Sequence, residues 1–152
     1  MLSWESDAAA DRVDAECRYG AIVHRRVVLF DKQARCLWVA DRLEGPPGVE
    51  PEFMQRWHCA ADWEKTGVSW ATENPAEVTI EESWRSEVFG QKERIPVIVV
   101  RWKSAFPACR ATLFDLAPEG AVPQRLIARW EPDSVDLRAG SGRALHAILK
   151  LK

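Results

Sequence analysis

Short runs of apolar, often β-branched residues recur along this 152-residue chain and are separated by turn residues. In residues 77–81, Val78 and Ile80 alternate with polar neighbours, which is the two-residue period of a half-buried strand. Helical spacing is not sustained over any long stretch. The runs that predict strands are 21–30, 35–43, 51–60, 67–72, 77–81, 95–103, 109–116, 126–130, 135–137 and 144–151.

Turn residues between these runs favour antiparallel pairing. Residues 31–33 (Asp-Lys-Gln) predict a tight turn between the first two strands, and residues 45–48 (Gly-Pro-Pro-Gly) end that hairpin, because proline cannot donate to a central ladder. Parallel strands would need helical crossovers, which the pattern lacks. The sequence therefore predicts an all-β fold, a twisted antiparallel β-sandwich in a single domain over residues 19–152. Residues 1–18 are polar and acidic, which predicts a weakly structured N-terminal arm.

Composition narrows the classes of partner. The chain is 47% hydrophobic and 29% charged, an ordinary globular composition, and its net charge of −2 argues against a nucleic-acid surface. No apolar run approaches the ~18 residues of a membrane helix, so we expect no membrane partner. Residues 1–7 lack the features of a signal peptide. The chain as it stands is expected in the cytoplasm, or in the periplasm if it is a piece of a longer exported protein.

Local motifs for metals, cofactors and catalysis are missing from the sequence. Cys17, Cys36, Cys59 and Cys109 form no C-x-x-C pair, and we expect them to be small core residues, with one disulfide left open. The histidines, His24, His58 and His146, are too widely spaced for a local metal motif. There is no G-x-S-x-G, P-loop or G-x-G-x-x-G sequence. We therefore predict no catalytic residues, no metal and no cofactor.

Tryptophan is the unusual component, with eight residues against one tyrosine. Four of them lie in apolar runs and are expected in the core: Trp38, Trp57, Trp102 and Trp130. Three lie among polar residues, where stacking on sugar rings and burial under a loop are both open: Trp63, Trp70 and Trp84.

Four segments together resemble a known family. Residues 24–31 (H-R-R-V-V-L-F-D) precede residues 37–45 (L-W-V-A-D-R-L-E-G), and residues 53–60 (F-M-Q-R-W-H-C-A) precede residues 82–90 (E-S-W-R-S-E-V-F-G). In order and spacing they are similar to the C-terminal β-sandwich of the heparinase II/III family of polysaccharide lyases. The resemblance covers about residues 12–116.

The resemblance implies a twisted, many-stranded antiparallel sandwich of the supersandwich kind. It also implies a parent reaction, β-elimination at a uronic-acid residue of an acidic polysaccharide such as a glycosaminoglycan. In the family, the catalytic groups come largely from an amino-terminal toroid and from G-H-x-H-x-D and H-N-T-V segments. This chain contains neither segment, and Tyr19 matches no catalytic tyrosine. We therefore expect the chain alone to be inactive.

The resemblance also directs attention to residues that could contact an anionic sugar. His24, Arg25 and Arg26 are the first candidates, because guanidinium groups bind carboxylate and sulfate in a bidentate manner. Cross-strand pairing of these residues is the alternative, and the one slightly favoured, with the partners Asp41, Glu44 or Glu52. The secondary candidates are Trp57, His58 and Trp84.

Three hypotheses for function follow. The first is a non-catalytic sandwich portion of a heparinase II/III-like lyase, structural and in contact with an acidic polysaccharide. The second is an interaction module that docks on a separate catalytic toroid or self-associates as a homo-oligomer through exposed strand edges and apolar surface. The third is a mutarotase-like sugar epimerase, which requires His24 and His58, or Glu82, to converge in one cleft.

Overall fold

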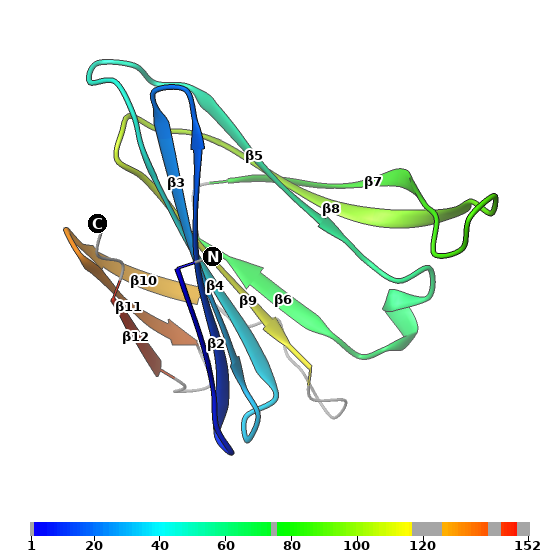
Figure 1. The fold of residues 1–152 in the computed structure, drawn as a ribbon. Coiled ribbons are helices and arrows are strands. Elements are labelled where there is room, and N and C mark those ends of the chain that lie inside the picture. The colour runs from blue at the N-terminus through cyan, green and yellow to red at the C-terminus, as the bar shows by residue number, and fades with distance from the viewer. Residues whose placement is uncertain (1, 74–75, 117–125, 140–143, 149–152) are drawn as a thin grey trace.

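A six-stranded antiparallel sheet forms the centre of the molecule in the computed structural model, which describes residues 2–73, 76–116, 126–139 and 144–148 (Figure 1). Its strands lie in the order β1 (Ser3–Ser6), β2 (Ala10–Tyr19), β3 (Ile22–Asp31), β4 (Cys36–Glu44), β9 (Ala108–Asp115) and β6 (Ser69–Thr72). A second sheet has the order β5 (Glu52–His58), β8 (Glu93–Lys103) and β7 (Glu77–Arg85). A third sheet has the order β10 (Leu126–Glu131), β11 (Ser134–Ala139) and β12 (Ala144–Ile148). A 3₁₀ turn, η1 (Trp63–Lys65), lies between β5 and β6.

The two smaller sheets pack on opposite faces of the central sheet (Figure 1). One apolar cluster joins Trp38 and Leu113 of the central sheet to Leu137 of the third sheet. Another joins Phe114 of the central sheet to Ile98 of the second sheet. Leu113 and Phe114 are adjacent in β9, and successive side chains of a strand point to opposite faces. The central sheet therefore contributes to two cores.

The described strands confirm the all-β, antiparallel, sandwich-like fold class. Each run that was expected to form a strand does so, although β7 continues to Arg85 and β8 begins earlier, at Glu93. Residues 149–151 of the last run lie outside the described residues. No helix in the described ranges has the length and apolar character needed to cross a membrane.

The N-terminal segment is the main correction. A weakly structured arm was expected, but β2 pairs with β3 over its whole length, and β1 pairs with β2. The turn between β1 and β2 is held by Asp7, whose carboxylate accepts the backbone N–H groups of Ala9 and Ala10. The polar composition misled the prediction because Asp14 of β2 is buried against a charged partner on β3.

The cysteines also depart in part from expectation. All four are free thiols, and Cys36 alone among them is fully buried, whereas Cys17 is exposed. The expectation of core cysteines therefore holds for Cys36, and the open question of a disulfide is answered by the absence of one in the structure.

Candidate functional site

A buried carboxylate on β4 organises the candidate site. Asp41 is only 2% exposed and accepts hydrogen bonds from Arg26 on β3, from Nε to Oδ1 at 2.7 Å and from Nη2 to Oδ2 at 2.8 Å. His24 Nε2–H donates to Oδ1 at 2.7 Å. Burial by itself would raise the pKa of Asp41, but the hydrogen bonds from His24 and Arg26 outweigh it and hold the pKa below its ordinary value. Asp41 is therefore an ionised acceptor.

Gln55 on β5 connects this group to the second sheet. Its Nε2 donates to Oδ2 of Asp41, and its Oε1 accepts the hydroxyl of Thr112 on β9 at 3.2 Å. Asp41 thus accepts four hydrogen bonds, which is about the number of lone-pair positions that a carboxylate offers. No acceptor position on Asp41 is left for a ligand.

Strand register explains why these residues meet. Arg26 and Asp41 are directly opposite one another in the β3–β4 ladder, and His24 lies two residues away on the same face. The expected cross-strand pairing with Asp41 is thereby confirmed for His24 and Arg26. Of the other expected partners, Glu44 pairs with Arg42 instead, at 2.6 Å.

Arg25 is separated from these two residues by the pleat of β3. It is buried on the opposite face and donates to both carboxylate oxygens of Asp14, from Nε at 3.0 Å and from Nη2 at 2.7 Å. The alternation of side chains along a strand required this outcome, because adjacent residues cannot share a face. The structure therefore brings His24 and Arg26 together and leaves Arg25 out.

A pocket of about 250 Å³, here called the His24 pocket, opens beside the Asp41 group. It lies where β5, the edge strand of the second sheet, passes the ends of β3 and β4. Its lining residues are His24, Arg26, Asp41, Leu43, Phe53, Met54, Gln55, Arg56 and Trp102. Sequence analysis missed Arg56 and Trp102. Along β5, the exposed residues Met54 and Arg56 alternate with buried ones. The sequence alone does not show that this edge strand lies beside β3.

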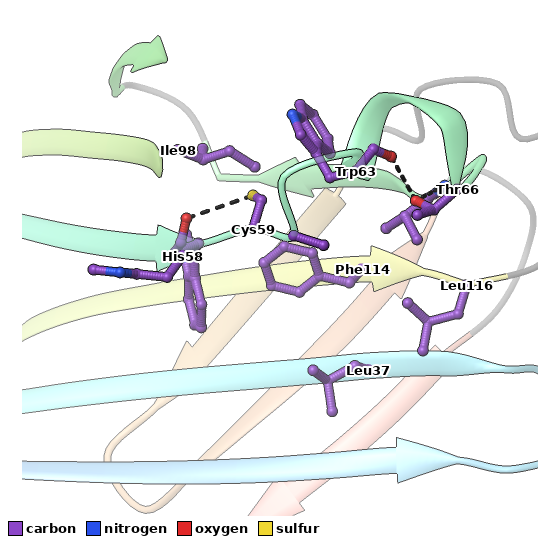
Figure 2. Close-up of a pocket in the computed structure, with 11 residues that line it drawn as sticks. Leu37, His58, Cys59, Trp63, Thr66, Ile98, Phe114 and Leu116 are labelled. Atoms are coloured by element: carbon purple, nitrogen blue, oxygen red, sulfur yellow. Dashed lines mark hydrogen bonds between the residues drawn. The ribbon is translucent and has the colours of Figure 1, made fainter. Parts of the chain in front are cut away.

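A second, apolar pocket of about 330 Å³ lies next to it and is here called the Trp57 pocket (Figure 2). Trp57 connects the two pockets: its ring lies 5.2 Å below the guanidinium of Arg26 and stands edge-on to Phe114 at 5.0 Å. His58 is exposed at the rim, and Figure 2 shows its ring directed away from Phe114. The lining residues are Leu37, Trp57, His58, Cys59, Ala60, Trp63, Thr66, Val68, Ile98, Phe114 and Leu116.

Trp84 lies apart from both pockets. It projects from β7, at the far edge of the second sheet, with 57% exposure and the guanidinium of Arg94 at 5.2 Å from its ring. Arg94 also pairs with Glu82 at 2.6 Å. Because His24 and His58 line different pockets and Glu82 lines neither, the convergence that an epimerase requires is not found.

The tryptophans expected in the core divide into two groups. Trp38 and Trp102 are buried, while Trp57 and Trp130 are half-buried. Trp63 and Trp70, which were left open, pack against the core cluster of the second sheet. Of the three tryptophans in polar surroundings, Trp84 alone is largely exposed.

Glu73 is a half-buried carboxylate, located just after β6. Its Oε1 accepts the indole N–H of Trp130 at 3.0 Å, and its Oε2 accepts the backbone N–H of Ala111 at 2.5 Å. Burial raises the pKa of Glu73 despite these bonds and the nearby Arg110. Burial also raises the pKa of the neighbouring Cys109 thiol to about 11, which keeps this thiol protonated. Within the described ranges, no three His, Cys, Asp or Glu side chains are grouped to hold a metal ion.

Comparison with known proteins supports a resemblance in fold. No family model and no curated protein match the sequence. Among solved structures, the heparinase III BT4657 gene product matches with a TM-score of 0.71 and 12% identity over 97% of this chain. The heparan sulfate lyase HepC from Pedobacter heparinus matches with a TM-score of 0.69 and 15% identity over 99% of this chain.

This chain has the fold of one region of heparinase III. The chain spans only 27% and 28% of the two solved chains described above, so it corresponds to about a quarter of their length. The resemblance that the four sequence segments indicated is confirmed at the level of fold.

Proposed function

We propose that this chain is a non-catalytic β-sandwich module of a heparinase III-type polysaccharide lyase, and that it contacts an acidic polysaccharide through the His24 pocket. The observation that carries the proposal is the match of nearly the whole chain to one region of heparinase III chains. One of those chains is described as a heparan sulfate lyase, an enzyme whose named polysaccharide is acidic.

The lining of the His24 pocket supports the polysaccharide contact. Arg26 and Arg56 both line the pocket, and their side chains are 36% and 40% exposed, so both guanidinium groups are accessible to solvent. The lining contains one carboxylate, Asp41, and its oxygens are already occupied. Guanidinium groups bind the carboxylate and sulfate groups of acidic sugars well, because their N–H groups match the spacing of two oxygens.

The same lining supports a non-catalytic role. β-Elimination needs a base, a group that neutralises the uronate and a donor that protonates the leaving oxygen. Among the described residues, the lining supplies one imidazole and two arginines but no hydroxyl, lysine or free carboxylic acid, so His24 alone would have to serve as both the base and the proton donor. Tyr19 does not line the pocket.

Two measurements test this proposal. Calorimetric titration with heparan sulfate is expected to show binding that Arg26→Gln and Arg56→Gln each weaken by about tenfold, because each removes one close charge interaction. Arg94→Gln, which changes an arginine outside the pocket, is the matched control and should bind like the wild type. β-Elimination would create a sugar product with a conjugated C4–C5 double bond that absorbs ultraviolet light. This absorbance should not increase when the chain is incubated with heparan sulfate. Absence of binding rejects the contact, and growth of absorbance rejects the non-catalytic role.

A second candidate function rests on exposed apolar side chains. Ile80, Trp84, Val88 and Phe89 on β7 and the β7–β8 turn are largely or fully exposed, and large apolar patches of this kind often mark interaction sites. They favour the interaction module, which docks on a toroid or self-associates. Light scattering across a concentration series tests self-association: oligomers that Phe89→Ser disperses support it, and a monomer at all concentrations rejects it.

A further inference from the structure

We infer that the His24 pocket is a pH-dependent clamp for a single oxyanion, a carboxylate or a sulfate, in which Asp41 positions His24 and Arg26 without contacting the anion itself. The identification of the anion's source, an acidic sugar, rests on the proposed function. The clamp itself rests on the geometry of the described residues and can be tested with small ions.

Asp41 determines which atoms of its neighbours remain free. Because Asp41 accepts hydrogen bonds from Nε and Nη2 of Arg26, both N–H groups of Nη1 remain available to a ligand. Because Asp41 also accepts a hydrogen bond from Nε2 of His24, Nδ1 is the imidazole nitrogen that remains for a ligand. Asp41 therefore holds both side chains in one orientation while its own oxygens are saturated.

Other donors on the lining lack strong acceptors. The nearest carboxylate oxygen to Arg56, on Glu81, lies 3.5 Å away, so Arg56 is only loosely paired. Trp102 is 8% exposed, and its indole N–H has no hydrogen-bond partner in the described part of the chain. The pocket thus offers hydrogen-bond donors with hardly any free acceptor, a combination that selects anions over neutral hydroxyl groups.

We assign the pH dependence of the clamp to the imidazole of His24, the histidine that lines the pocket. The charged neighbours are Asp41 on β4, Arg26 on β3 and Arg56 on β5, and Arg110 on β9 is directly opposite Asp41. The lowered pKa of Asp41 keeps this carboxylate ionised across the neutral range. On β2, Cys17 is directly opposite His24, and Tyr19 lies two residues further along the same face. A hydrogen bond with Cys17 raises the pKa of Tyr19, so the phenol stays uncharged. Imidazole is the side chain that ordinarily changes charge between pH 5 and 8.

Protonation of His24 raises the formal charge of the lining from +1 to +2. A proton on Nδ1 also converts this atom from an acceptor into a donor. Both changes favour an oxyanion, so its affinity increases as the pH falls. The sign follows from linkage, because a ligand that binds the protonated form better must bind more tightly where that form is populated.

The experiment is an NMR titration of the whole chain with sodium sulfate and, separately, sodium glucuronate, at constant ionic strength between pH 5.5 and 7.5. We expect the affinity for both ions to be about tenfold higher at the low end, from one added close charge. The variant His24→Gln keeps a donor for Asp41 but does not titrate, so its affinity should not change with pH. His58→Gln removes an exposed histidine outside the pocket and should keep the wild-type pH dependence.

The possible outcomes separate this inference from the proposed function. Failure of a folded chain to bind either ion at pH 5.5, or a pH dependence that persists in His24→Gln, overturns the clamp. If the ions bind as expected but heparan sulfate does not, the clamp stands and the polysaccharide proposal fails. If heparan sulfate binds but neither ion does, the polysaccharide proposal stands and the clamp fails. Binding of sulfate without glucuronate, or the reverse, decides which oxyanion it takes.

Discussion

Arg25 and Arg26 are consecutive residues of β3, and each holds a carboxylate through two hydrogen bonds, yet they serve different ends. The Arg25–Asp14 pair has side-chain exposures of 6% and 9%, so it is sealed on one face of the central sheet. In the Arg26–Asp41 pair the carboxylate is sealed but the guanidinium is 36% exposed. The difference teaches that the same pairing chemistry closes off both charges where both partners are covered, and leaves a guanidinium accessible to solvent where one partner stays open.

The largest effect is expected from breaking the sealed pair. Arg25→Ala leaves Asp14 as a buried charge without its bidentate partner, and should lower the free energy of unfolding by about 3 to 5 kcal/mol. Chemical denaturation with urea measures this change. Anion binding at neutral pH should be retained by the folded fraction, and a loss of less than about 1 kcal/mol would contradict the structural role of this pair.

A smaller loss is expected from the carboxylate of the open pair. Asp41→Asn should cost about 2 to 3 kcal/mol, because Arg26 and His24 lose a charged acceptor. The pKa of folded Asp41 lies below the ordinary 3.8, so its ionised form stabilises the fold above that pH, and the stabilisation is lost as the pH falls through the lower folded value. Unfolding measured between pH 2 and 6 should therefore show a shallower acid loss in Asp41→Asn than in the wild type.

Removing the open guanidinium should cost less stability and more function. Arg26→Gln is expected to lower the unfolding free energy by about 1 to 2 kcal/mol, since glutamine still donates one hydrogen bond to Asp41. Oxyanion affinity should fall by about tenfold in the same variant. Urea denaturation and the sulfate titration measure the two quantities. Equal stability losses in Arg25→Ala and Arg26→Gln would erase the distinction between the sealed and open pairs.

The smallest effect is expected at Glu73, which sharpens the comparison with Asp41. Asp41 is buried, whereas Glu73 is half-buried and accepts the N–H groups of Trp130 and Ala111. Burial raises the pKa of Glu73 above the ordinary 4.5. The folded state then favours the protonated form, so stability is greatest below that pH and falls as the pH rises through the folded pKa. Glu73→Gln should remove this fall, by about 1 kcal/mol, in unfolding measured between pH 4 and 8. If Glu73→Gln and the wild type show the same dependence of unfolding free energy on pH, this prediction is wrong.

Much of the fold could be predicted because strand patterning is local. The alternation of Val78 and Ile80 and the turn at residues 31–33 indicated their strands without knowledge of any partner. The N-terminal strands were missed, because the stabilising partner of Asp14 lies on another strand and composition does not reveal it.

The candidate site was predicted in part. His24 and Arg26 share a face of β3 by alternation alone, and the expected pairing with Asp41 followed from the hairpin. Arg25 was grouped with them, although the two-residue period of a strand separates it. Arg56 and Trp102 were not found, since they belong to a different sheet and join the pocket only through the packing of the two layers.

The sequence by itself determined the strands from residue 22 onward, the β3–β4 hairpin and the face on which His24 and Arg26 lie, because these depend on the period of the backbone and on short turns. Only the tertiary structure decided that the edge of β5 lies against β3 and β4, which adds Gln55 to the residues that donate to Asp41 and brings Arg56 to the pocket. The physical reason is range: alternation acts between neighbouring residues, whereas the stacking of sheets depends on apolar side chains far apart in the chain.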